Sequence, residues 1–556
     1  MGSQSGHRSA PAVVRVTALL TAILLVANWC AGSDSKPPAP KKPPKPTAAG
    51  PAPEAAAQLV TRPERPLDDR EAMYPRAIRL KDGRIIVSVS SSAQGGLTDL
   101  ARFYESADDG ATFKPISEIR DDRAAGGRGG CCGSLFQLPH QVGAQPAGTL
   151  LWAWTVGMKN KAPGRHPELR IWRSTDGGRH WSHLSSCASA PPGTPSDQGL
   201  WEPELALDAQ GRLVCYFSDE TRPGHDQTIA QVVSTDGGVT WGARTDVITL
   251  GGGARPGMPV VRRTPNGTYF MVYEVCGRDQ DSCKVHYRTS PDGWNWGDPR
   301  DVGTAVRTVD GKFLYHAPTV TWIPGGGPNG RLLLVGGLLR SENGKLSRPA
   351  SGSTILVNVD NGRGRWYEQS APVRVDFSAR PDHDEVVCDN YSSTMLPVAD
   401  GNGLLEVATE RSGSKTCRAF VGTAAMQPAA PAPPKPGSYR LRNAGSGLCL
   451  DATGPGDTTR QLPCDARRPR QKWTISGTPD ASLKLRNAKT GRCLGGPCAT
   501  SPTWSVNQLT GMIYTVVAKA SGNCIDVAGG SHTAGAAVQQ APCTGRAAQL
   551  WRVEPR

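Results

Sequence analysis

The chain has 556 residues and a formal net charge of +14, too long for one small core and long enough for two or three domains. The basic charge is scattered, part of it in "KKPPKP" (41–46), and no basic motif interleaved with aromatic residues occurs. Composition therefore argues against a nucleic-acid partner and favours a soluble exported protein with a basic surface.

Residues 1–32 are predicted to be a signal peptide. Arg8 and Arg15 precede the apolar run "VTALLTAILLVANW" (16–29), which is too short to span a bilayer comfortably, and the small residues at 30–32 allow cleavage. Cys30 leaves a lipoprotein as the less favoured alternative, because Asn28 and Trp29 poorly match the small residues expected before a lipidated cysteine. We expect a secreted protein without membrane attachment after cleavage.

Two Pro- and Ala-rich stretches, 33–60 and 426–437, cannot bury a core and are predicted to be spacers. They separate a domain at 61–425 from a second domain at 438–556.

The first domain repeats the pattern Ser-x-Asp-x-Gly-x-x-aromatic. The copies are "SADDGATF" (106–113), "STDGGRHW" (174–181), "STDGGVTW" (234–241) and the shortened "SPDGWNW" (290–296). Between them, apolar strands flank Gly turns such as "KDGR", "PAGT", "AQGR" and "PNGT". Six such hairpins without helical periodicity predict an all-β fold, a six-bladed β-propeller.

The repeat resembles the Asp box of sialidases and other six-bladed glycoside hydrolases. We expect its Asp to cap its own turn and its aromatic residue to pack inward, which is a structural role. The functional face should then lie opposite these turns, where strand A of each blade starts and strand B ends.

This face collects acids, arginines and aromatic residues, the composition that a sugar-cleaving pocket needs. The candidates are Tyr74, Arg76, Asp99, Trp201, Glu202, Glu204, Asp219, Glu220, Arg255, Glu274, His316, Tyr391 and Glu410. Arg76, Asp99, Trp201, Arg255, His316 and Tyr391 are predicted to bind substrate.

Glu202 and Glu274, from neighbouring blades, are the predicted catalytic pair. Glycosidic cleavage needs one carboxyl to protonate the leaving oxygen and a second carboxylate to attack or to activate water. Trp201 either raises the pKa of Glu202 by desolvation or offers a surface on which a sugar stacks. Glu204 is a reserve candidate, because strand alternation puts it on the same side as Glu202.

Two families compete. "NYSSTMLPVADGNGLLEVATE" resembles the sialidase segment that carries the tyrosine nucleophile, which would give that role to Tyr391 and the acid role to Asp99. Sialidases, however, hold a substrate carboxylate with three arginines. Here the first motif reads "YPRA", with Arg76 after the proline, and the second region reads "CYFSDE", with acids where a cation is needed.

The chain looks closer to the exo-acting α-L-arabinanases through "YPRAIRL", "LWEPELALD" and "RPGMPVVRRTPNGTYFMVYE". That resemblance implies a retaining cleavage of a neutral furanose polymer by Glu202 and Glu274, without assigning nucleophile and acid/base. A non-catalytic glycan-binding protein is the alternative of another class.

Residues 438–556 hold three similar units, two ending in Gln-x-Trp, and resemble the ricin-type β-trefoil lectin module. The resemblance implies disulfides Cys449–Cys464 and Cys524–Cys543, with Cys493–Cys498 a tighter possibility, and sugar-hydroxyl acceptors at Asp451 and Asp526. Gly495 replaces the acceptor of the middle unit, and Leu462 and Ala541 replace the stacking aromatic residues. Gln471, Trp473, Gln549 and Trp551 are expected in the core.

Without Cys30 the chain has 14 cysteines, an even number that favours disulfides in an exported protein. Cys276 and Cys283 are close enough in sequence to close a surface loop, and at least one of the adjacent Cys131 and Cys132 is expected to pair elsewhere. No His/Cys cluster has metal-binding spacing, so no metal or cofactor is predicted. The expected protein is a monomer that acts on a polysaccharide or glycan.

Overall fold

The computed structural model describes residues 61–91, 99–159, 164–277, 283–308, 311–324, 329–348, 350–377, 388–398, 401–412, 416–426, 434–453, 458–478, 482–510, 513–544 and 546–556. The predicted signal peptide with Cys30, the spacer at 33–60 and most of the spacer at 426–437 lie outside these residues. Among the described residues, no helix is long and apolar enough to cross a membrane.

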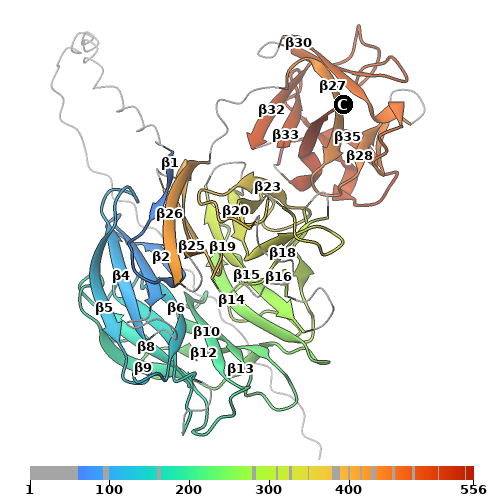
Figure 1. Ribbon diagram of the computed structural model, residues 1–556. Helices are drawn as coiled ribbons and strands as arrows, with labels where there is room; N and C mark the ends of the chain where they lie inside the picture. The colour runs from blue at the N-terminus through green and yellow to red at the C-terminus, as the bar shows by residue number, and fades with distance from the viewer. Residues whose placement is uncertain are drawn as a thin grey trace, which may run out of the picture. The chain divides into compact units, whose positions relative to one another are not determined.

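The first domain is a six-bladed β-propeller built of antiparallel sheets (Figure 1). Blade 1 is β2 (Met73–Arg79), β3 (Ile85–Ser91), β4 (Leu100–Ser106) and β5 (Lys114–Arg120). Blade 2 is β6 (Gly130–Gln137), β7 (Leu150–Val156), β8 (Glu168–Ser174) and β9 (Ser182–Ser189). Blade 3 is β10 (Leu200–Leu207), β11 (Leu213–Asp219), β12 (Thr228–Ser234) and β13 (Thr245–Ile248).

Blade 4 is β14 (Arg255–Arg263), β15 (Tyr269–Cys276), β16 (Lys284–Ser290) and β17 (Thr304–Ala305), extended by β18 (Phe313–Tyr315) and β21 (Leu338–Arg340). Blade 5 is β19 (Thr319–Ile323), β20 (Arg331–Val335), β22 (Thr354–Asn358) and β23 (Tyr367–Ser370). Blade 6 is β24 (Thr394–Val398), β25 (Gly403–Ser412) and β26 (Thr416–Ala425), completed by the N-terminal strand β1 (Arg62–Pro66).

The ring of blades closes in two ways. Strand β1 pairs antiparallel with β26, with Arg62 opposite Thr423, so the start of the domain supplies the last strand of its final blade. The first strands of the blades, β2, β6, β10, β14, β19 and β24, contact one another in order, and β24 contacts β2. The second strands of blades 1 to 3 are buried along their whole length, as "LLWAWTV" in β7 illustrates, because each blade packs against a neighbour on both faces.

The Ser-x-Asp turns join the third and fourth strands of blades 1 to 4, and their aspartates serve the turn itself. Asp236 accepts hydrogen bonds from the backbone N–H groups of Val239 and Thr240, and these bonds lower its pKa to about 2 although burial opposes them. Trp296 is buried and Trp241 packs against the core at the same position of the repeat. The contacts give these aspartates a structural role.

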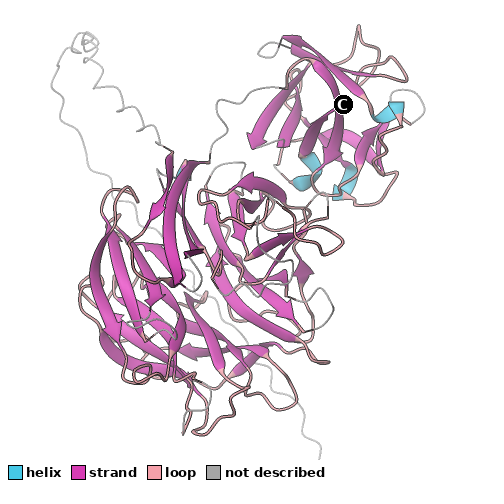
Figure 2. Ribbon diagram, in the orientation of Figure 1, coloured by secondary structure: helices cyan, strands magenta, loops and turns pink. Residues whose placement is uncertain are grey.

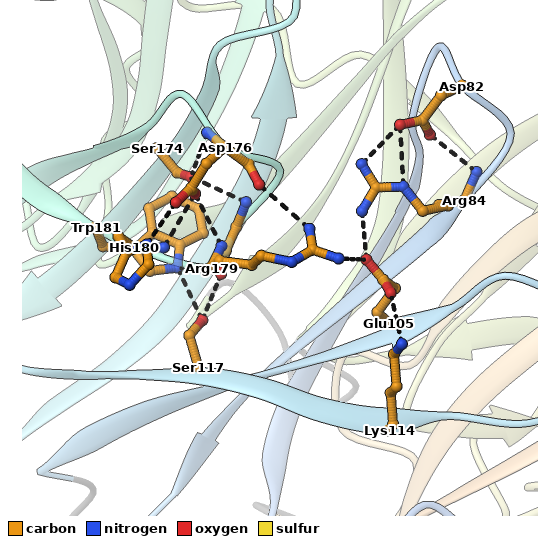
Figure 3. A network of polar contacts seen from close by, with 11 residues as sticks. Asp82, Arg84, Glu105, Lys114, Ser117, Ser174, Asp176, Arg179, His180 and Trp181 are labelled. Atoms are coloured by element: carbon orange, nitrogen blue, oxygen red, sulfur yellow. Dashed lines mark hydrogen bonds and ion pairs between the residues drawn. The ribbon is translucent and has the colours of Figure 1, made fainter.

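One such turn also ties two blades together (Figure 3). Arg179, in the turn of blade 2, reaches the buried Glu105 of β4 with its guanidinium 3.1 Å from the carboxylate. Arg84 and Lys114 bind the same carboxylate from within blade 1. Burial by itself raises the pKa of Glu105, but the three cations outweigh it and hold the pKa below its usual value.

The C-terminal domain is a β-trefoil that also holds short 3-10 helical turns at Pro469–Gln471, Ala528–Gly530 and Ala547–Gln549 (Figure 2). Its strands are β27 (Gly437–Asn443), β28 (Cys449–Asp451), β29 (Thr459–Leu462), β30 (Trp473–Thr478), β31 (Ser482–Asn487), β32 (Trp504–Thr510), β33 (Ile513–Ala518), β34 (Cys524–Val527), β35 (Ala537–Ala541) and β36 (Trp551–Pro555). Trp473, Trp504 and Trp551 form its core. Gln471 and Gln549 are buried and bind the backbone of their own units, so they belong to the core as expected.

Seven disulfides join the cysteines of the described residues. They are Cys131–Cys132, Cys187–Cys215, Cys276–Cys283, Cys388–Cys417, Cys449–Cys464, Cys493–Cys498 and Cys524–Cys543. The expectation that Cys131 or Cys132 pairs elsewhere is wrong, since the two bind each other. Cys132 has a φ of 64° and the ladder is bulged between Cys131 and Ser134, which breaks the alternation that normally points adjacent side chains apart.

Replacing Glu105 by Gln should lower the free energy of unfolding by about 2 kcal/mol at pH 7, because a buried carboxylate loses its charge-assisted hydrogen bonds with cations of two blades. The pKa of Glu105 is depressed, so the stabilisation is present above the ordinary carboxyl pKa and is lost as the pH falls through the folded-state pKa. Urea unfolding at pH 7 and pH 4 measures this difference. Asp298→Asn, which removes only a local pair with Arg300, is the control; an equal loss for both variants at pH 7 would contradict the assignment.

Candidate active site

A pocket of about 430 Å³ opens at the starts of the first strands of blades 3 to 6. Of the eight residues predicted to be catalytic or to bind substrate, six line it: Trp201, Glu202, Arg255, Glu274, His316 and Tyr391. Glu220, Gln227, Tyr315 and the disulfide Cys276–Cys283 complete its lining. The sequence analysis predicts Glu220 on the functional face, but no sequence signal singles out Gln227 or Tyr315.

The pocket depends on a backbone feature repeated in every blade. Two positions before the regular part of each first strand lies a non-glycine residue with positive φ: Tyr74 (51°), Cys132 (64°), Glu202 (48°), Met258 (56°), Ala317 (49°) and Ser392 (57°). In blades 1 to 4 it coincides with a register shift of the ladder. A left-handed conformation at an L-residue disfavours folding by roughly 1–2 kcal/mol, and such residues concentrate at functional sites.

Four of these six residues form one apolar cluster. Tyr74, Cys132, Met258 and Ala317 are buried against one another, and Tyr391 packs on them. Glu202 occupies the equivalent position in blade 3 and is therefore the acidic member of an otherwise largely apolar ring.

The surroundings of Glu202 favour its protonated form. Its pKa is raised to about 7, chiefly by burial and further by the negative charge of Glu274, against the opposing effect of a hydrogen bond from Ser218. The Ser218 hydroxyl donates to Glu202 Oε2 at 2.6 Å and accepts the backbone N–H of Met258. Ser218 is a functional candidate that the sequence did not reveal, because only the β11 register brings it opposite Trp201.

Glu274 is held by different donors. Its Oε2 lies 2.7 Å from His316 Nδ1 and accepts the backbone N–H of Ala317 at 2.7 Å. Its Oε1 is 3.4 Å from the sulfur of Cys276. The hydrogen-bond partners thus gather on Oε2, and Oε1 is the oxygen beside the disulfide.

Glu220 organises the rim. It accepts a hydrogen bond from the Trp201 indole N–H at 2.7 Å and binds Arg255, whose guanidinium also donates to Gln227. The only arginine among the described lining residues is thus neutralised by an acid. Trp201 is fixed with an aromatic ring at the pocket wall.

Two of the predicted substrate-binding residues are not part of the described lining. Arg76 is buried, stacks over Tyr74 and donates to Ser392, so it supports the ring of first-strand residues instead of facing the pocket. Asp99 precedes β4, and its backbone N–H donates to the carbonyl oxygen of Ser91. Its negative charge contributes to the raised pKa of Glu71.

The expectation that Glu204 shares the side of Glu202 is wrong, because the bulge between Trp201 and Glu204 interrupts the alternation. Glu204 is buried and ion-paired with Arg262. The remaining acids of the mouth are also engaged, since Asp219 binds Arg244 and Glu410 accepts the N–H of Asp376.

The described residues hold one group with metal-ligand geometry: Glu274, Cys276, Cys283 and His316. Its two sulfurs are joined in a disulfide and cannot act as thiolate ligands. A larger cavity of about 1000 Å³ lies at the other ends of the first strands, but its one acidic lining residue, Asp208, is paired with Arg212.

The two acceptors predicted in the trefoil differ. Asp451 is fully buried and its Oδ2 lies 2.5 Å from Arg468 Nε, whereas Asp526 is half-buried. The carboxylate of Asp451 is therefore occupied by a cation of its own unit.

Comparisons with known proteins agree with both domains. Residues 430–502 and 500–556 match the family described as "Ricin-type beta-trefoil lectin domain-like". An α-L-arabinanase of Penicillium chrysogenum, solved with arabinobiose, is 26% identical with a TM-score of 0.53, over 66% of this chain and 97% of that one. An α-L-arabinofuranosidase of Fusarium graminearum, solved with an iminosugar inhibitor, is 23% identical with a TM-score of 0.52, over 66% and 99%.

No curated protein sequence matches the chain. The two structural matches span 66% of this chain and nearly the whole length of each relative. They agree with the resemblance that the sequence motifs indicate. The chain is a glycoside hydrolase with a ricin-type lectin domain.

The titration of Glu202 tests the electrostatics of the pocket. In protein labelled with ¹³C at glutamate carboxyls, one resonance should titrate near pH 7 and disappear in Glu202→Gln. Glu274→Gln should lower this pKa because it removes a negative neighbour, and Ser218→Ala should raise it because it removes a donor to the carboxylate. A Glu202 pKa near 4.5 in the unmodified protein, in Glu274→Gln and in Ser218→Ala would refute the burial of Glu202.

Proposed function

We propose that this glycoside hydrolase is a secreted, monomeric exo-α-L-arabinanase that cleaves a neutral arabinan with retention, using Glu202 and Glu274. The observation that carries the proposal is a shared pocket in which the charge of Glu274 helps to raise the pKa of Glu202 to about 7. Such a pair holds one proton at neutral pH, the state that glycosidic cleavage requires.

In the proposed reaction, one carboxyl donates its proton to the glycosidic oxygen while the other carboxylate bonds to the anomeric carbon and displaces the leaving sugar. Water, deprotonated by the first residue, then releases the glycosyl group and restores the starting protonation. In the free enzyme the proton resides on Glu202. Because bound sugar changes the solvation of both carboxyls, the two roles are assigned by experiment below.

The two glutamates lack the arginine partners that hold their acidic neighbours. Among the described residues, no arginine or lysine pairs with Glu202 or Glu274, whereas Arg255 and Arg262 hold Glu220 and Glu204. This contrast favours catalysis over the non-catalytic glycan-binding alternative, in which salt bridges would lock the carboxylates.

A neutral substrate fits the pocket better than a sialoside. Three carboxyl groups line it, and its one described arginine is already paired, so a substrate carboxylate would be repelled. Tyr391 is a poor nucleophile here, because burial and the charges of Glu202 and Glu274 push its pKa well above the usual value. Asp99, the acid of the sialidase alternative, is not among the described lining residues.

Secretion is supported by the seven disulfides of the described residues, which form in oxidising compartments. The trefoil is proposed to keep the enzyme on a glycan surface, raising the local concentration of substrate for the propeller.

Debranched arabinan and a sialoside distinguish the two substrate classes. Arabinan should be cleaved and the sialoside should not, and Glu202→Gln and Glu274→Gln should each lower kcat/KM on arabinan by at least about 10³-fold. Glu118→Gln, on the outer strand of blade 1, is the matched control and should retain activity. Sialoside cleavage, or unchanged arabinan cleavage in both glutamate variants, would refute the proposal.

The pH dependence of kcat/KM tests whether the glutamate pair holds one proton, and azide rescue assigns the nucleophile and acid/base roles. The raised pKa predicts that kcat/KM falls above about pH 7, where the pair loses its proton. With an activated aryl arabinoside as substrate, azide should restore activity to Glu202→Ala and to Glu274→Ala. The variant that forms a glycosyl azide of inverted configuration lacks the nucleophile, and the variant that forms one of retained configuration lacks the acid/base. Failure of azide to rescue either variant would contradict a carboxylate pair.

A further inference from the structure

The net positive charge of the chain is concentrated in the trefoil. The interpretation of the basic charge as scattered along the sequence is therefore wrong. Residues 61–433 contain 41 Lys and Arg against 41 Asp and Glu, whereas residues 434–556 contain 16 against 6, a net charge of +10. The propeller domain is thus formally neutral, and the lectin domain is strongly basic. A basic surface on a glycan-binding domain points to an anionic ligand.

The basic residues gather on one turn of the first trefoil unit. Between Cys464 and Trp473 the chain carries four cations: Arg467, Arg468, Arg470 and Lys472. The C-terminal Arg556 joins them, because its guanidinium donates to the backbone oxygens of Asp465 and Arg468. These five residues are called the cation cluster below.

The other two units show that the trefoil fold does not require this charge. The corresponding turn from Cys543 to Trp551 has one cation, Arg546, and the turn from Cys498 to Trp504 has none. All three turns lead to a tryptophan of the same core. The cation cluster is therefore a property of the first unit alone.

The first unit has also lost the means of binding a neutral sugar. Asp451, the expected acceptor of sugar hydroxyls, is fully buried and bound to Arg468. Leu462 stands where an aromatic residue would stack on a sugar face. Arg467 and Arg556 are exposed beside this closed acceptor, and Asp465 is the one exposed acid on the turn.

We propose that the cation cluster binds an acidic polysaccharide, a chain of uronic acid residues, through ion pairs between the sugar carboxylates and its cations other than Arg468, which Asp451 holds. Guanidinium groups suit carboxylates because they donate two parallel hydrogen bonds. The clustering favours a repeating anion over a single charge, since several exposed ion pairs are needed where each contributes little. The glycan setting of the chain favours a polysaccharide over a nucleic acid.

Binding should be measured on the full chain carrying Glu202→Gln, so that hydrolysis does not interfere. The probes are polygalacturonate, dextran as a neutral polysaccharide that is not the proposed substrate, and duplex DNA, compared by isothermal titration at low and high salt. Polygalacturonate should bind more tightly than DNA, and high salt should weaken it, as expected for exposed charges. Equal or tighter binding of DNA, or no preference for polygalacturonate over dextran, would overturn the proposal.

A variant with Arg467→Gln, Arg470→Gln and Lys472→Gln should lose at least about tenfold in affinity for polygalacturonate, because three ion pairs are lost together. The matched control removes the same charge elsewhere in the trefoil with Arg460→Gln, Lys519→Gln and Arg546→Gln, all exposed positions. Equal losses in the two triple variants would mean binding by net charge alone and would refute a site at the cluster.

Asp526→Ala separates this surface from a neutral-sugar site in the third unit. It should leave polygalacturonate affinity unchanged, and a parallel loss would place the ligand in the third unit and contradict the proposal. Circular dichroism of each variant confirms that the trefoil is folded, and the binding comparison uses only variants that pass it. Because the measurement is independent of hydrolysis, its failure would leave the proposed propeller chemistry standing.

Discussion

The burial of one carboxyl group, that of Glu202, is the constraint on which the site depends. Each blade holds the residue two positions before the regular part of its first strand in a left-handed conformation, and most of these residues are apolar. Placing a glutamate at one of the six positions removes its side chain from water close to a second carboxylate. Desolvation and like charge then act together, and the pair retains a proton at neutral pH.

Such a position is tolerable only because the scaffold around it is stiff. The contacts between first strands close the ring, and β1 completes the last blade. Between blades 1 and 2 a buried glutamate collects cations from both. At the mouth itself, the disulfides Cys131–Cys132 and Cys276–Cys283 fix the backbone beside the ring and beside Glu274. The strain of the left-handed residues is thus borne by interactions elsewhere.

The propeller and much of its mouth could be predicted because repeats and hairpins encode blade spacing and strand direction. The identity of the ring could not, since its positive-φ residues are Tyr, Cys, Glu, Met, Ala and Ser, without the glycine that usually marks this conformation. The same bulges defeat simple alternation, which is why Glu204 and the pairing of Cys131 with Cys132 were misjudged. In the trefoil the burial of Asp451 depends on a contact with Arg468 that no motif contains, whereas counting charge by domain would have revealed the basic lectin from the sequence.

The central claim is that a glutamate at this mouth forms the covalent bond to the sugar. Trapping the intermediate with an activated 2-fluoro arabinofuranoside, followed by peptide mass spectrometry, tests it most directly. The account predicts one added glycosyl group per chain, attached to Glu202 or Glu274. Attachment to Tyr391, or turnover of activated arabinosides with inversion and no attached sugar, would contradict it.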